Sequence, residues 1–92
     1  MMTFYTAELV TTRGGDQHWK STKRYPTDKK AAAAIIAKAK REKMRVTGYQ
    51  RWWYSHGSAM VDFGSYSFYG RIDKWRDGKR IDIETNRVLD MV

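Results

Sequence analysis

Residues 26–43, PTDKKAAAAIIAKAKREK, decide the fold because they predict the one helix of the chain. Pro26 ends the segment before it, and the Thr27 hydroxyl can accept a hydrogen bond from a free backbone N–H of a helical turn that begins at Asp28. Asp28 at the start and the basic residues at the end suit the helix dipole. The residues that share one stripe at helical spacing are Ala32, Ile35, Ile36 and Ala39. This narrow stripe of small side chains favours close packing of the helix on a sheet.

Two strands are expected before the helix. Thr3 to Thr12 is rich in β-branched and aromatic residues and places Tyr5, Ala7 and Leu9 on one face. The Gly-Gly-Asp sequence at 14–16 tolerates positive φ and favours a turn. Gln17 to Tyr25 is therefore predicted to pair back on the first strand.

Strands also follow the helix. The segments with strand composition are Arg45 to Tyr54, Ala59 to Phe63, Tyr66 to Trp75 and Arg80 to Glu84. Asp77-Gly78 is the strongest hairpin signal, because a type I′ turn needs positive φ at both central positions. Ser55 to Ser58 predicts another turn, and Gly64 could mark a bulge.

These segments predict a single small basic domain, residues 1–92, of the α+β class. The expected order is ββαβββ, with one helix packed on one face of a mostly antiparallel sheet of four to five strands. A helix over 28–43 is too short to cover both faces of such a sheet. One sheet face is therefore expected to meet water or a partner.

The charge of the chain points to an acidic partner. Eighteen Lys and Arg residues against ten Asp and Glu give a net charge of +8, which attracts nucleic acid or an acidic protein surface. Without cysteine the chain can form neither a disulfide nor a thiolate metal site, which suits the cytoplasm. The first residues lack the pattern of a secretory signal, and the longest apolar run, 31–37, is too short to span a bilayer. No membrane partner is expected.

The uncovered sheet face is the main candidate site. If Val46, Trp52, Phe68, Ile72, Ile81 and Ile83 face the helix, unbroken alternation places an aromatic and basic set on the other side. This set comprises Tyr49, Arg51, Trp53, Tyr69, Arg71 and Trp75. Planar side chains can stack on bases while arginines neutralise phosphates. The same aromatics could instead form cross-strand packing pairs.

Two further basic groups could contribute phosphate contacts. Lys40, Arg41 and Arg45 lie at and just beyond the end of the predicted helix, and Arg76 and Lys79 flank the Asp77-Gly78 turn. Lysines on a helix are also a common solvated surface, and so is a charged hairpin tip.

No catalytic or metal-binding motif is recognisable. The two histidines, His18 and His56, have no metal-ligand spacing with carboxylates, and no phosphate-binding glycine loop occurs. We therefore expect no enzyme activity, no metal and no cofactor. A small ribonuclease that uses His18 or His56 is the remaining catalytic alternative.

The sequence leads to two hypotheses of different kinds. The first is a non-catalytic accessory module that binds DNA or RNA through the aromatic and basic sheet face. The alternative is a small protein-binding inhibitor or regulator, of the type encoded by phages and other mobile elements, because Trp, Tyr and Arg also dominate protein interfaces. The sequence leaves open whether the chain is a monomer or a homodimer.

Overall fold

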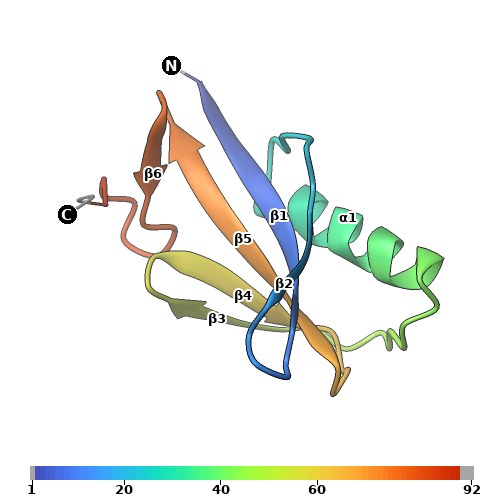
Figure 1. Ribbon diagram of the computed structural model, residues 1–92. Coiled ribbons are helices and arrows are strands. Elements are labelled where there is room, and N and C mark those ends of the chain that lie inside the picture. The colour runs from blue at the N-terminus through green and yellow to red at the C-terminus, as the bar shows by residue number, and fades with distance from the viewer. Residues whose placement is uncertain (1, 90–92) are drawn as a thin grey trace.

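The computed structural model describes residues 2–89, and it confirms one helix on one face of an antiparallel sheet. The elements are β1 (Thr3–Thr11), β2 (Gln17–Lys20), α1 (Asp28–Arg41), β3 (Arg51–Ser55), β4 (Ser58–Asp62), β5 (Phe68–Arg76) and β6 (Lys79–Ile81). Figure 1 shows the sheet, whose strand order is β2-β1-β5-β4-β3, with β6 paired to the end of β5. The described residues thus form six strands in the order ββαββββ, against the four to five strands and the order ββαβββ expected.

The helix begins where the sequence predicts and ends earlier. The Thr27 hydroxyl accepts a hydrogen bond from the Lys30 backbone N–H at 3.1 Å, which confirms the expected cap. α1 stops at Arg41 because Lys43 adopts a left-handed conformation with φ of 57°. The backbone N–H groups of Lys43 and Met44 then donate to the carbonyls of Lys40 and Ala39, which forms a Schellman motif.

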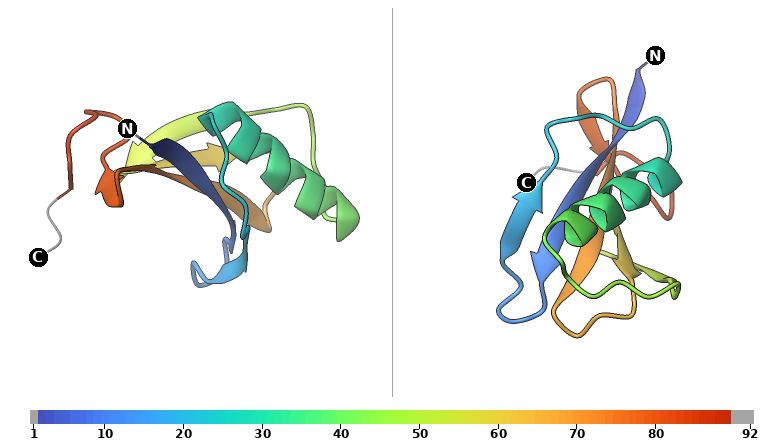
Figure 2. Two further views of the ribbon diagram at one scale, coloured as in Figure 1. Left: turned by 90° about the horizontal axis from the view of Figure 1, so that it is seen from above. Right: turned by 90° about the vertical axis from the view of Figure 1, so that its right-hand side faces the viewer.

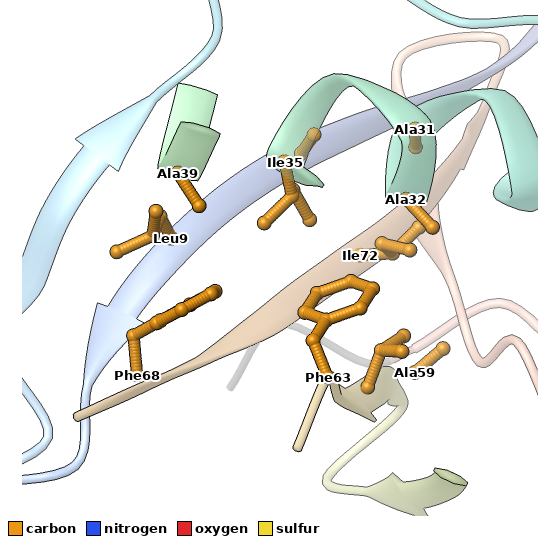
Figure 3. Close-up of a cluster of buried hydrophobic side chains, with 11 residues drawn as sticks. Leu9, Ala31, Ala32, Ile35, Ala39, Ala59, Phe63, Phe68 and Ile72 are labelled. Carbon is orange, nitrogen blue, oxygen red and sulfur yellow. The ribbon is translucent and has the colours of Figure 1, made fainter. Parts of the chain in front are cut away.

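The core lies between α1 and the sheet. Figure 3 shows Ile35 and the helix alanines above Leu9, Ile72 and the two rings Phe63 and Phe68. The Phe63 and Phe68 rings stack with centroids 6.0 Å apart. Of the residues expected to face the helix, Phe68 and Ile72 are in this core, and Val46, Trp52 and Ile83 pack at its edge. Ile81 is buried outside it.

Gly70 lets the helix approach the sheet. A Cβ atom at this position of β5 would lie 2.9 Å from Ile35 Cδ1 and 3.0 Å from Phe63 Cε2. Both distances are shorter than ordinary carbon contacts. The bare backbone of Gly70 is therefore part of the floor on which Ile35 packs.

The strand boundaries differ from those expected. β3 starts at Arg51 and not at Arg45, because a bend at Gly48 interrupts the segment. β2 ends at Lys20, after which the Ser21 hydroxyl accepts from the Lys23 N–H in a turn. The ends of the remaining strands lie within three residues of those expected, and β1 starts at Thr3 as expected.

Two hairpins have the two-residue turns typical of twisted antiparallel strands. Asp77 and Gly78 have φ of 53° and 81° and join Arg76 to Lys79, as the sequence predicts. His56 and Gly57 have φ of 51° and 85° and join β3 to β4 in the same way. His56 thus holds a left-handed conformation that is uncommon for a residue with a side chain.

Among residues 2–89, no helix is long and apolar enough to cross a membrane.

Candidate functional site

The side of the sheet opposite α1, called the open face below, is left uncovered by the helix. Figure 2 shows α1 on one side of the sheet only. On β1, Ala7 and Leu9 point into the core, so Glu8 between them faces the other way. Strand pairing then carries this face across the sheet in one row: Lys20, Glu8, Arg71, Met60 and Trp53. Arg71 and Trp53 therefore share the open face, as the alternation predicts.

Three of the predicted residues, Arg51, Trp53 and Tyr69, contact one another at one side of this face. The guanidinium carbon of Arg51 lies 5.1 Å from the centroid of the Trp53 ring, within the range of a cation–π contact. The Trp53 ring also meets the Tyr69 ring, with centroids 6.3 Å apart and planes inclined by 46°. These side chains come from β3 and β5, on either side of β4. We name these three residues, together with Arg71 on the same face of β5, the aromatic–basic cluster.

Trp75 is on the open face but belongs to a separate group. Its ring stacks on Phe4 with centroids 6.4 Å apart, and its indole N–H donates to the Thr6 hydroxyl at 3.1 Å. The guanidinium of Arg24 lies 4.3 Å from the Phe4 centroid on this group. Trp75 therefore serves as a cross-strand packing partner, which is the alternative that the sequence left open.

A buried polar network separates the two groups. Asp73 is buried on the open face and accepts a hydrogen bond from the Ser58 hydroxyl. Arg71 Nε lies 3.2 Å from the Ser58 hydroxyl oxygen and 3.7 Å from Asp73 Oδ2. Arg80 donates to the Ser58 hydroxyl at 2.9 Å and to the His56 carbonyl at 2.7 Å. The Asp73 carboxylate is thus flanked by two arginines, Arg71 and Arg80.

The other predicted site residues are not brought to this cluster. Tyr49, expected on the same face, precedes β3 and is not in a strand, so alternation does not place it; its side chain is 51% exposed. Lys40 and Arg41 lie in the last turn of α1, which covers the opposite face, and Arg45 lines a hollow with the 64–67 loop.

Arg76 and Lys79 face each other beside the β5–β6 turn. By alternation they lie on the side of the sheet opposite Trp75. Neither residue therefore adds to the basic surface around Arg51 and Arg71.

Glu8 was not predicted as a site residue, although it lies on a middle strand of the open face, between Lys20 and Arg71. It is only 8% exposed, and it lies directly opposite Arg71 on β5. A single charged residue between two core positions of a strand was the available signal, since Ala7 and Leu9 flank it. Its proximity to Arg71 depends on the pairing of strands that are distant in sequence.

Each of the two histidines makes a polar contact with a neighbouring side chain. His18 Nε2 lies 2.7 Å from Glu42 Oε1, so it ties β2 to the end of α1. Hydrogen bonds from His18 and then Lys38 hold the pKa of Glu42 below its ordinary value. His56 Nδ1 lies 3.0 Å from the Ser55 hydroxyl oxygen in the β3–β4 turn. Within residues 2–89, no group of three or more His, Asp or Glu side chains could hold a metal ion.

Comparison with known proteins adds no further constraint. No protein-family model matches the chain, no curated protein matches its sequence, and no solved structure matches its fold.

Proposed function

We propose that this protein is a non-catalytic module that binds single-stranded nucleic acid across the open face. The observation that carries the proposal is the aromatic–basic cluster, in which Arg51 lies over Trp53 and Trp53 meets Tyr69. Proteins that bind single strands combine aromatic stacking surfaces with a positively charged path for the backbone. The cluster supplies both elements within a few ångströms.

The exposure of the cluster supports stacking by unpaired bases. Trp53 and Tyr69 are half-buried, so each ring is anchored by the sheet and still offers part of its surface. A base can also stack on the guanidinium plane of Arg51, which is exposed. In a duplex the bases are already stacked on each other, so these rings favour an unpaired strand.

The net charge of +8 supplies the long-range attraction. Arg51 and Arg71 lie on the open face itself, and Arg24 extends the positive charge to the Phe4–Trp75 pair. Phosphates that contact Arg51 and Arg24 release condensed counterions, so affinity should fall with salt. We place this function in the cytoplasm, where a chain without cysteine needs no oxidising environment.

Tryptophan fluorescence provides the test. The purified protein is titrated with short single- and double-stranded DNA and RNA at about 50 and 200 mM salt. The proposal expects quenching that is strongest for single strands and weaker at the higher salt. Absence of a response to all four nucleic acids overturns it. Intact RNA after prolonged incubation separates binding from the ribonuclease alternative.

A protein-binding inhibitor or regulator is the second candidate, and the mixed charge of the open face favours it. Glu8 and Asp73 place carboxylates among the arginines, whereas a surface for the phosphate backbone alone would be more uniformly basic. Trp, Tyr and Arg are also the side chains enriched at the centres of protein interfaces. Capture of a defined protein that survives nuclease treatment, together with no oligonucleotide binding, selects this candidate.

A further inference from the structure

The open face contains a pocket beside the aromatic–basic cluster. It has a volume of about 470 Å³, which falls within the range of about 300–1,000 Å³ for small-molecule sites. The residues that line it are Glu8, Val10, Gly15, Gln17, Ser55, His56, Met60, Tyr69 and Arg71. It thus has a strand floor from β1, β4 and β5, and residues of the β1–β2 and β3–β4 turns form part of its wall.

Glu8 gives this pocket an acceptor without a partner. The residue is nine-tenths buried, yet no hydrogen bond or ion pair joins its carboxylate to another of residues 2–89. Its neighbours in the strand register are Lys20 and Arg71, both basic. Its oxygens still reach the solvent of the pocket, since neither is among the fully buried side-chain atoms without a hydrogen-bond partner. Glu8 is therefore poised to accept N–H groups of a ligand.

Arg71 gives the pocket donors in a fixed orientation. Its Nε is held by the Ser58 hydroxyl oxygen at 3.2 Å and by Asp73 Oδ2 at 3.7 Å. No hydrogen bond to another of the described residues uses its two terminal nitrogens. The buried network thus fixes the base of the guanidinium and leaves its outer edge to a ligand. Tyr69, which precedes Arg71 by two residues on β5, offers a ring beside both groups.

The charges exclude a phosphate as the preferred occupant of this pocket. A phosphate would pair well with Arg71 but would be repelled by the carboxylate of Glu8 at the same site. A group that donates hydrogen bonds on one edge and accepts them on another satisfies both side chains. Nucleobases have this character, and phosphates do not.

We propose that the pocket binds one unpaired guanine base of the nucleic acid, a proposal that rests on the function proposed above. Guanine carries two adjacent donors, N1–H and N2–H, which match the two oxygens of the Glu8 carboxylate. It also carries two adjacent acceptors, O6 and N7, which match the two terminal nitrogens of Arg71. Tyr69 stacks on the face of the base.

The other bases form fewer hydrogen bonds with Glu8 and Arg71 than guanine does. Cytosine and adenine each offer a single amino group to Glu8, so one carboxylate oxygen stays without a donor. Thymine and uracil offer a single imino N–H. An unpaired buried acceptor is the kind of defect that gives strong discrimination. Guanine is therefore the base that the pocket selects.

Single-base substitution in a labelled strand tests the inference on the unmodified protein. Fluorescence anisotropy measures Kd for an oligothymidylate and for the same strand with one central guanine, inosine, 7-deazaguanine, adenine or cytosine. We expect guanine to bind at least about tenfold more tightly than thymine. Inosine, which lacks the N2 amino group, and 7-deazaguanine, which lacks N7, should each lose much of this gain.

The Glu8→Gln variant tests whether the preference for guanine arises in this pocket. An amide has one acceptor oxygen and turns an N–H toward the base, so the ratio of the thymine Kd to the guanine Kd should fall to near one. Glu84→Gln, the same change at an exposed site outside this pocket, should keep the ratio of the wild type. Circular dichroism melting checks that both variants are folded.

The outcomes separate the two proposals. Salt-sensitive binding with equal affinity for all strands overturns the guanine pocket and leaves the open-face function standing. Tighter binding of adenine or cytosine also overturns it. No binding to any strand overturns both.

Discussion

The guanidinium carbon of Arg51 lies 5.1 Å from the centroid of the Trp53 ring, on strand β3 at the edge of the sheet. The two residues are separated by one position, so the pleat puts both on the same face. A cation is thereby held beside an aromatic surface before any ligand arrives. This preorganisation reduces the side-chain entropy that binding must otherwise cost. It makes Arg51 and Trp53 the first positions at which the proposed function can be tested.

Trp53→Ala should weaken the binding of single-stranded DNA or RNA by about 5- to 150-fold. Stacking of a base on an aromatic side chain contributes about 1–3 kcal/mol, and each 1.4 kcal/mol corresponds to tenfold in Kd. Anisotropy titration with a labelled oligonucleotide measures the change. Tyr54→Ala is the matched control, since Tyr54 is the next residue of β3, points to the other side and is 48% exposed. Equal losses in both variants would contradict a specific role for Trp53.

Arg51→Gln should reduce the salt dependence of binding as well as the affinity. One phosphate contact on a single strand contributes about 0.7 to the slope of log K against log salt concentration. The slope measured between about 50 and 200 mM salt should therefore become shallower by roughly that amount. Lys29→Gln removes the same charge from the exposed side of α1 and should leave the slope nearly unchanged. A slope that responds equally to both changes would indicate nonspecific attraction by net charge.

The class of fold was predictable because its signals are local. The cap at Thr27 and the turn at Asp77-Gly78 need only neighbouring residues, and both are present as expected. The end of α1 was not predictable, because Lys43 adopts a left-handed conformation. Glycine is the residue that usually signals this conformation at a helix end, and the sequence has none there. The start of β3 was predicted too early, at Arg45. The chain bends at Gly48, so the strand alternation begins only at Arg51.

The candidate site was predictable only in part. Alternation within β3 and β5 correctly grouped Arg51 and Trp53 with Tyr69 and Arg71 on one face. The pairing of Trp75 with Phe4 and of Arg71 with Glu8 depends on the β1–β5 register, which joins opposite ends of the chain. Long-range register is set by packing and cannot be read from a single segment.

Lys43→Gly should stabilise the protein by up to about 1 kcal/mol. Lys43 occupies the left-handed position of the Schellman motif at the end of α1, with φ of 57°. Glycine adopts this conformation without the steric cost that a Cβ atom brings. Urea denaturation measures the free energy of unfolding. Lys40→Gly, inside the last helical turn, should instead destabilise by about 1 kcal/mol. A loss of stability at position 43 would contradict the assigned geometry.

Gly70→Ala should destabilise the protein by about 1–3 kcal/mol, the usual cost of an extra methyl group in a packed core. The new Cβ would lie 2.9 Å from Ile35 Cδ1 and 3.0 Å from Phe63 Cε2, and both partners are buried. Thermal and urea unfolding measure the effect. Gly48→Ala introduces the same methyl group where nothing lies within 4 Å, so it should be nearly neutral. Comparable losses at both sites would show that the tight packing of α1 on β5 is not the cause.

Glu42→Gln should lower stability at neutral pH and have no effect in strong acid. Hydrogen bonds from His18 and Lys38 lower the pKa of Glu42 in the folded protein below the ordinary value of 4.5. A carboxylate with a depressed pKa contributes stability above its unfolded pKa and loses it as the pH falls through its folded pKa. The unfolding curves of wild type and Glu42→Gln should therefore differ above about pH 4.5 and converge below it. Glu84→Gln, at an exposed position, serves as the control. A difference between wild type and Glu42→Gln that persists in strong acid would show that the carboxylate charge is not what ties β2 to the end of α1.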